Sequence, residues 1–283
     1  MNRLDNPRRV QVVKCLCEGL SIRATVRLTG VAKNTVVKLL ADLGKVCAAY
    51  HDEHVRNVAA KRIQCDEIWS FCYGKDKNVS DEQKAAGAGS VWTWTALDAN
   101  SKLIVSYLCG GRDASYARLF MEDVASRVTS RVQITTDGQR AYVEAVEGAF
   151  GMNVDYAMLI KLYGSPANAD TRYSPGEVIG TEMIRVMGGP DPRYISTSFV
   201  ERQNLTMRMS MRRFTRLTNG FSKKLENHEH MLAIYFMYYN YSRVHQTLRV
   251  TPAMEAGIAY HVWNVREIVA LLDRRSILAG LVA

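Results

Sequence analysis

Long hydrophobic runs and paired cysteines are both missing from this sequence of 283 residues. The most apolar stretch, residues 231–241, has 11 residues and is interrupted by Asn240, whereas a membrane-spanning helix needs about 20 apolar residues. The six cysteines show no Cys-x-x-Cys zinc knuckle and no repeated spacing, and nothing at the N-terminus resembles a secretory signal. We therefore expect free thiols, no membrane segment and a cytoplasmic location.

Acidic residues are the minority charge, and they are unevenly distributed. The chain has 37 Lys and Arg against 28 Asp and Glu, a formal net charge of +9. Residues 1–62 carry 12 basic and 5 acidic residues, residues 63–198 carry 13 and 17, and residues 199–249 carry 9 and 3. Two basic arms flank an acidic middle. This distribution favours a polyanionic partner such as nucleic acid, although charge alone leaves an ordinary solvated surface equally open.

The first 45 residues have the pattern of three short helices, over residues 8–18, 21–29 and 33–43. Ser21 is suited to cap the second helix, and Gly30 and Gly44 to end the second and the third. Two short helices that cross at a Gly-Val turn are typical of a helix-turn-helix DNA-binding domain, which we assign to residues 1–45. A plain three-helix cap is the alternative. The third helix would present four donors to base edges and phosphates: Lys33, Asn34, Thr35 and Lys38.

After a helical linker over residues 46–61, the pattern changes to strands. Strands are expected over residues 62–73, 91–98, 102–109 and 131–136, and helices over residues 113–128 and 140–150. This order predicts an α/β fold with an RNase H-like (retroviral integrase-like) mixed sheet, in a catalytic domain over residues 62–245. Four of the six prolines fall within residues 158–195, which we expect to be an irregular insertion. Residues 246–283 form a C-terminal tail.

Three acidic residues stand in contexts that suit a shared site. Asp66 lies in the first strand, Asp137 follows the fourth, and Glu201 lies near the start of a basic helix expected from Ser198 to about residue 217. The first and fourth strands are neighbours in an RNase H-like sheet. Two carboxylates about 4 Å apart repel by roughly 4 kcal/mol at an effective dielectric of 20, so converging acids need protons or a cation. We predict two Mg²⁺ ions, with Mn²⁺ as a substitute.

Glu67 is next to Asp66, but strand alternation sends its side chain to the opposite face. Only Asp66 is therefore expected to enter the shared site.

The basic helix adds candidate supporting residues. Helical spacing puts Glu201, Asn204 and Arg208 on one face, so we hypothesise that Asn204 and Arg208 orient a metal ligand or contact the scissile phosphate. Four further arginines would follow a DNA backbone, with a solvated surface as the alternative for each: Arg202, Arg212, Arg213 and Arg216. The sequence does not tell whether His245, Lys223 or Lys224 enters the site.

Several motifs together resemble one family. They are Cys-Asp-Glu-Ile-Trp-Ser-Phe at 65–71, Thr-Thr-Asp-Gly at 135–138, Glu-Arg-Gln-Asn-Leu-Thr-Met-Arg at 201–208, Arg-Arg-Phe-Thr-Arg-Leu-Thr-Asn at 212–219, Tyr-Asn-Tyr-Ser-Arg-Val-His at 239–245 and Thr-Pro-Ala-Met at 251–254. In these segments the chain resembles the bacterial DDE transposases of the insertion-sequence-one-like family. The family's acidic triad falls on Asp66, Asp137 and Glu201.

The resemblance implies a DNA transposase that binds terminal inverted repeats through its N-terminal domain, cuts the element ends and joins the freed 3′-hydroxyls to target DNA. It also implies double-stranded DNA as partner, a homodimer or higher assembly in a synaptic complex, and a location at the bacterial nucleoid. Related proteins often carry a Cys-x-x-Cys zinc module before the helix-turn-helix, and this chain lacks it.

Two other functions remain open at this point. A metal-dependent nuclease of the resolvase type would use the same fold and acids, because fold alone does not determine function. A catalytically inert helix-turn-helix regulator would use the DNA-binding domain alone, although acids at all three positions argue against it.

Overall fold

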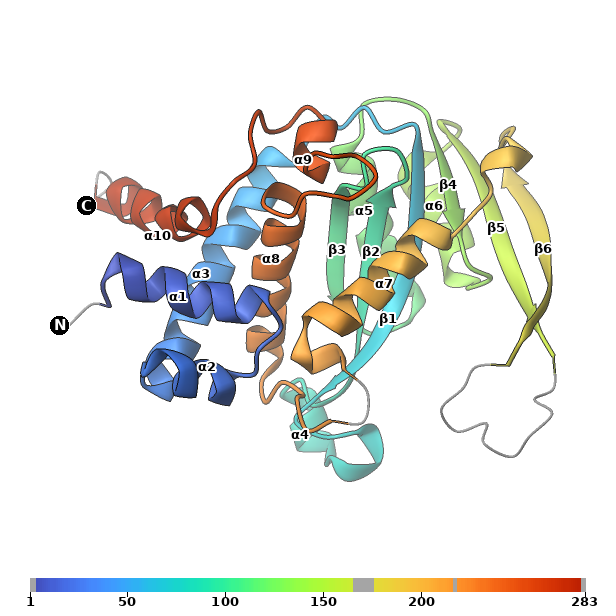
Figure 1. Ribbon diagram of the computed structural model, residues 1–283. Helices are drawn as coiled ribbons and strands as arrows, with labels where there is room; N and C mark the ends of the chain where they lie inside the picture. Colours follow the sequence, from blue (N-terminus) through green and yellow to red (C-terminus); the bar gives the residue numbers. More distant parts are fainter. Residues whose placement is uncertain (1–3, 165–175, 216–217, 281–283) are drawn as a thin grey trace.

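The computed structural model describes residues 4–164, 176–215 and 218–280, with side chains described as far as residue 273. Its centre is a six-stranded mixed sheet with the strand order β3-β2-β1-β4-β5-β6 (Figure 1). β1 pairs antiparallel with β2 and parallel with β4, and β5 continues the parallel part. This topology confirms the RNase H-like α/β class. The strands are β1 (Arg62–Cys72), β2 (Gly89–Asp98), β3 (Ile104–Gly110), β4 (Val132–Thr136), β5 (Val154–Tyr163) and β6 (Val178–Met187).

Helices cover both faces of the sheet. α5 (Ala114–Arg127) and α6 (Ala141–Phe150) lie behind it in Figure 1, and α7 (Ser198–Ser210) crosses in front of β1. Asp113 caps α5 by accepting hydrogen bonds from the N–H groups of Ser115 and Tyr116. The expected helices over residues 113–128 and 140–150 are therefore confirmed within a residue or two.

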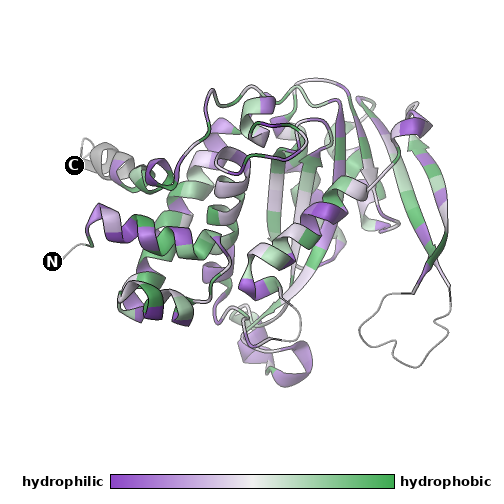
Figure 2. Ribbon diagram, viewed as in Figure 1, coloured by the Kyte–Doolittle hydropathy of each residue, from purple (hydrophilic) through white to green (hydrophobic). Residues whose placement is uncertain are grey.

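A bundle of helices lies beside β3. It contains α1 (Asn6–Cys17), α2 (Ile22–Thr29), α3 (Lys33–His54), α8 (Leu225–Tyr241) and α10 (Val265–Gly280) (Figure 1). Figure 2 shows hydrophobic residues along both α3 and α8 and hydrophilic residues around the short α4 (Asp81–Ala85). The buried residues of this bundle and of the central sheet form one hydrophobic cluster, from Val10 to Leu271. The first three helices are therefore packed onto the same core as the sheet.

Asn240 explains the one polar interruption of the most apolar stretch. Its side chain is fully buried in α8, where Nδ2 donates to the Ile104 carbonyl at 3.1 Å and Oδ1 accepts from the Ile104 N–H at 3.0 Å. Ile104 is the first residue of the edge strand β3. The amide thus satisfies backbone groups that have no strand partner on that side.

Gly44 does not end the third helix, contrary to the sequence-based expectation. α3 continues through Gly44 to His54, so the whole helix has 22 residues and includes much of the expected linker. A Cβ at Gly44 would lie 2.3 Å from the Cβ of His230 on α8. The glycine therefore allows two helices to cross closely.

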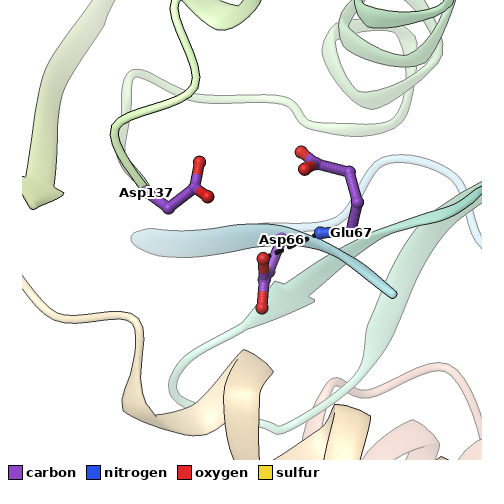
Figure 3. Close-up of side chains that lie close together, drawn as sticks. All are labelled: Asp66, Glu67 and Asp137. Carbon is purple, nitrogen blue, oxygen red and sulfur yellow. Dashed lines mark hydrogen bonds between the residues drawn. The ribbon is translucent and has the colours of Figure 1, made fainter. Parts of the chain in front are cut away.

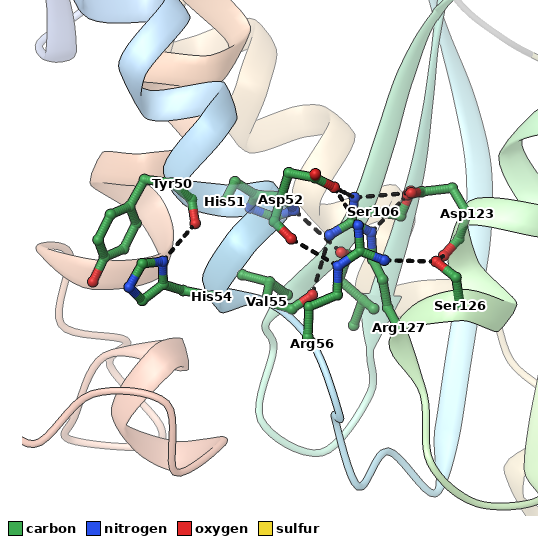
Figure 4. Close-up of polar contacts among 11 residues, drawn as sticks. Tyr50, His51, Asp52, His54, Val55, Arg56, Ser106, Asp123, Ser126 and Arg127 are labelled. Atoms are coloured by element: carbon green, nitrogen blue, oxygen red, sulfur yellow. Dashed lines mark hydrogen bonds and ion pairs between the residues drawn. The ribbon is translucent and has the colours of Figure 1, made fainter. Parts of the chain in front are cut away.

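The C-terminal half of α3 is tied to α5 through the buried guanidinium of Arg127 (Figure 4). Arg127 donates to Asp123 at 2.7 and 2.8 Å, to Asp52 at 2.9 Å and to the Val55 carbonyl at 3.1 Å. Nearby, Nε2 of His51 lies 3.1 Å from the Val105 carbonyl, and burial lowers the pKa of His51 to about 4. The imidazole is therefore neutral at pH 7 and can donate to that carbonyl.

Two other expectations need correction. Residues 154–163 and 178–187 are the antiparallel strands β5 and β6, so residues 158–195 are not simply irregular; Pro166 and Pro175 lie outside the described residues. α7 ends at Ser210 and is followed by a 3₁₀ turn at Arg212–Phe214, so the helix is shorter than expected. Ser198 is its first residue and Thr197 its N-cap. Nowhere in the described chain is a helix long and apolar enough to cross a membrane.

We predict that Gly44→Ala will destabilise the protein by about 2–3 kcal/mol or more, because the added methyl group overlaps the backbone and Cβ of His230. Urea unfolding at constant pH measures this change. Gly148→Ala on α6 is the matched control, since its Cβ would meet nothing within 4 Å, and it should leave stability unchanged or raise it by up to about 1 kcal/mol. Equal stability of the two variants would contradict the close crossing.

Candidate active site

The parallel pairing of β1 and β4 brings Asp66 and Asp137 to the same level of the sheet. Gln64 is paired with Thr135, so two residues further along each chain lie Asp66 and Asp137. Asp137 directly follows the last residue of β4, and its Oδ1 accepts from the N–H of Gln139 at 3.0 Å, which holds the turn. The sequence-based expectation that these two acids are neighbours agrees with this register.

Glu67 is closer to the two aspartates than strand alternation suggested. Figure 3 shows the side chains of Asp66 and Glu67 leaving β1 on opposite sides, with Asp137 beside the strand. One carboxylate oxygen from each of the three residues lies within 4.8 Å of the other two. As alternation predicts, Glu67 does not line the cavity that Asp66 enters, but its carboxylate is close enough to both aspartates to share a cation with them. Alternation sets the direction of a side chain, but a glutamate beside a strand edge can still reach round it.

Glu201 joins the aspartates at one cavity of about 430 Å³, which Asp66, Asp137 and Glu201 line together. It lies in the first turn of α7. Its Oε1 accepts from the Thr197 hydroxyl at 2.6 Å, and its Oε2 accepts from Nζ of Lys161 on β5. The three predicted acids therefore share a cavity, with the Glu201 carboxylate held by a lysine.

Gln64 fixes the position of α7. Its buried side chain on β1 accepts from the N–H of Phe199 at 2.8 Å and of Val200 at 3.1 Å. These are first-turn amides, which have no partner within a helix, and Thr197 makes no capping bond to them. A strand residue two positions before Asp66 thus caps the helix that carries Glu201.

Asp66 is the most perturbed acid of the site. Burial, the nearby Glu67 and Asp137 carboxylates and, to a lesser degree, Glu201 raise its pKa to about 7. Its Oδ1 accepts from the N–H of Glu67 at 2.8 Å, and its Oδ2 accepts from Nδ2 of Asn204 at 2.8 Å. Asn204 is 5% exposed, so this contact is shielded from water. Asn204 therefore orients Asp66, as its place on the Glu201 face of the helix suggested.

Arg112 is a site residue that sequence reasoning missed. It follows the edge strand β3, and its Nε donates to Glu67 at 3.0 Å while Nη2 lies 3.6 Å from Oδ2 of Asp137. The guanidinium also lies over the Trp92 ring, 4.6 Å from its centre. Burial raises the pKa of Glu67, against the lowering effects of the Tyr142 hydroxyl and the Arg112 guanidinium. Arg112 therefore neutralises only part of the negative charge.

Lys161 was missed for a different reason: the strand that carries it was read as part of an insertion. The apolar run from Tyr156 to Ile160, which forms the middle of β5, was the available signal.

The remaining predicted residues lie outside the acidic cavity. Arg208 is half-buried on α7 one turn after Asn204, and Arg202 is exposed on the same helix. Arg212 is exposed after α7, whereas the half-buried Arg213 donates to the Asn227 carbonyl at 2.6 Å. Arg216 lies outside the described residues. The four residues expected to read DNA are all exposed in the first two turns of α3: Lys33, Asn34, Thr35 and Lys38. Lys38 pairs with Asp42 at 2.5 Å.

His245, Lys223 and Lys224 do not line the acidic cavity, which settles a point that the sequence left open.

We predict that Asp66→Asn will stabilise the metal-free protein at pH 8 by about 1–3 kcal/mol. The pKa of Asp66 is about 7 in the folded state against an ordinary value near 4, so between these values the folded state binds more protons and stability falls as pH rises. The neutral amide removes this loss. Urea unfolding in chelator at pH 5 and pH 8 measures it, and a stability difference from wild type that did not depend on pH would contradict the repulsion.

No protein-family model matches the sequence, and no curated protein matches it either. Three solved structures are similar to the chain. One is a piggyBac transposase synaptic complex with hairpin DNA, with 10% identity, a TM-score of 0.46, and 97% of this chain and 73% of that chain covered. The others are the Mos1 Strand Transfer Complex (10% identity, TM-score 0.25, 83% and 77% covered) and the Mos1 mariner paired end complex with Mn (9%, 0.27, 84% and 76%). At such identities and scores, the chemistry of the cavity rests on its own residues.

Proposed function

We propose that this protein is a DNA transposase that binds the terminal inverted repeats of its element, cleaves the ends in a metal-dependent reaction and transfers the 3′-hydroxyls to target DNA. The insertion-sequence-one-like type is the one that its sequence motifs resemble. The observation that carries the proposal is the cavity shared by Asp66, Asp137 and Glu201, each from a different element.

The residues of the cavity suit divalent cations. All candidate ligands are carboxylates, which Mg²⁺ and Mn²⁺ prefer, and the three nearest oxygens belong to Asp66, Glu67 and Asp137. Burial and the nearby Glu67 and Asp137 carboxylates raise the pKa of Asp66 to about 7, so a bound cation would lower the cost of ionising it. Asp66, Asp137 and Glu201 would hold the ions, with Glu67 as an additional ligand.

When bound, two such ions would activate the attacking oxygen, first of water and then of a 3′-hydroxyl, and stabilise the leaving oxygen. The chain's own groups prepare the site. Asn204 holds Asp66 in one orientation, and Gln64 fixes the helix that carries Glu201. Arg112 and Lys161 place two cations at the cavity, where they would bind oxygens of the substrate phosphate. Arg208 would contact the backbone next to the scissile phosphate.

DNA is supported as substrate by the exposed donors at the start of α3 and by the basic residues after α7. Lys33, Asn34 and Thr35 follow a short turn after α2, the arrangement in which a recognition helix enters a major groove. A synaptic complex of two or more copies is part of the proposal, because both ends of an element have to be cut and joined.

We expect Glu201→Gln to abolish cleavage and joining of a labelled duplex that bears the element ends in Mg²⁺, with a loss of about 10³-fold or more, while end binding persists. Glu122→Gln, an exposed glutamate on α5, is the control and should match wild type. Strand cleavage and joined products are separated on denaturing gels.

Other results would select a different function. Cleavage without any joined product would favour a resolvase-type nuclease, and specific end binding without cleavage by wild type would favour a regulator. Full activity of Glu201→Gln would refute the role of this residue.

Metal binding should depend on pH. Because the pKa of Asp66 is about 7, the carboxyl is mostly protonated at pH 6 and mostly ionised at pH 8, so Mn²⁺ affinity should rise about tenfold between these values. Isothermal titration of Mn²⁺ at both values measures this. Glu67→Gln should weaken Mn²⁺ binding about tenfold at pH 8, whereas Glu122→Gln should not. An unchanged affinity of Glu67→Gln would remove Glu67 from the ligand set.

A further inference from the structure

A second cavity, of about 790 Å³, lies between the N-terminal helices and the segment from Met211 to Lys224. Its walls come from the α1–α2 turn, the first turns of α3, the segment after α7 and the start of α8. Gly19 fixes one wall: it has a φ of +77°, and a Cβ there would lie 2.8 Å from the Ser210 carbonyl oxygen. The N-terminal helices therefore meet the end of α7 at backbone distance, which defines the shape of this groove.

The charge of the groove is of one sign. Among its 21 lining residues, all within the described chain, none is acidic and six are basic: Arg23, Lys33, Arg212, Arg213, Lys223 and Lys224. None of these six takes part in an ion pair with a carboxylate of the described residues, whereas Lys38 and Lys161 do. Six cations around one hollow repel one another, and an anion that binds there removes this repulsion.

Several of these groups are held in place. Arg213 is fixed by its hydrogen bond to the Asn227 carbonyl, and burial lowers its pKa to about 10, so it remains charged at pH 7. Lys223 Nζ lies over the Phe221 ring, 4.4 Å from its centre. The first turn of α3, which carries Lys33 and Asn34 in the wall of the groove, has backbone N–H groups without a side-chain cap, because its N-cap residue is Ala32. The groove is thus built from ordered donors.

We propose that this groove binds a phosphodiester backbone, as a second DNA contact separate from the acidic cavity. That this phosphodiester backbone is DNA rests on the proposed function. Charges of one sign, fixed donors and walls from four chain segments suit a repeating phosphate chain, and the Phe221 ring suits the sugars between phosphates.

The position of the groove relative to the acidic cavity follows from α7. Glu201 lines the cavity near the start of this helix, and Met211 lines the groove just after its end. Ten residues of helix span about 15 Å. With a scissile phosphate at the acids, the groove would hold backbone about four to five base pairs away, at roughly 3.4 Å per step.

The test uses the full-length protein and fluorescence anisotropy on a labelled 30-base-pair duplex, between 50 and 200 mM salt. We expect the Lys223→Gln, Lys224→Gln double variant to bind more weakly and to show a slope of log affinity against log salt that is smaller in magnitude by about 2, because each lost phosphate contact removes about 0.9. Arg212→Gln alone should reduce it by about 1. The matched control is Lys61→Gln with Arg118→Gln, two exposed cations outside the groove, and it should keep the wild-type slope.

The outcomes separate this proposal from the proposed function. If wild type binds DNA and both groove variants keep its slope, the groove proposal is overturned while the transposase proposal stands. If wild type binds no DNA but binds a labelled polyglutamate peptide through Lys223 and Lys224, the groove takes an acidic peptide, and both proposals fail. Binding of neither probe also overturns both. Thermal unfolding of each variant identifies any loss that comes from misfolding, and Arg212→Gln then decides the case if the double variant is unfolded.

Discussion

Repulsion among carboxylates at the junction of β1 and β4 is the constraint around which the rest of this molecule is arranged. The register of two parallel strands puts Asp66 and Asp137 at the same level of the sheet. Glu67 is the next residue on β1, and its carboxylate lies close to both. Polar groups around these carboxylates compensate part of their negative charge. Arg112 pairs with Glu67, Lys161 with Glu201, and Asn204 donates to Asp66. Burial, together with the neighbouring Glu67 and Asp137 carboxylates, still raises the pKa of Asp66 to about 7. A fold that kept these acids apart would be more stable and would have no such cavity.

The two ends of α7 have opposite electrostatic character. Its first turn faces an acidic cavity, and the residues after its last turn line a groove with only basic charges. Metal cations bound by the acids would neutralise the negative charge of the cavity. Phosphates bound in the groove would neutralise its positive charge. Gln64 anchors the start of the helix and the Gly19 contact secures its end, so the two regions keep a constant separation. In the proposed function, polyanion binding and the chemistry would therefore use different ends of one helix.

The sequence was sufficient for the order of the central elements and for the neighbouring strands of Asp66 and Asp137, because the apolar strand runs are separated by clear turns and the pairing of the first and fourth strands follows from the RNase H-like order. The sequence was insufficient where one residue type can serve two structural roles. Glycine often ends a helix, but Gly44 instead allows α3 to cross closely at His230, 186 positions away. Prolines around residue 170 concealed β5 and β6. Arg112 and Gln64 act through contacts far away in sequence, which no local pattern records.

The uninterrupted course of α3 has a consequence for how such a protein would treat its substrate. Its 22 residues form a rod about 33 Å long, with Lys33 at one end and, at the other, contacts to Arg127 of α5 and, through His51, to Val105 of β3. A helix–loop–helix connection would let the two halves swing, and a rod does not. If α3 reads DNA at its tip as proposed, the distance between the bases that it contacts and the bond held at the acids would then be fixed. Lengthening the DNA between these points by half a helical turn, about five base pairs, would turn the wrong face of the duplex toward the acids.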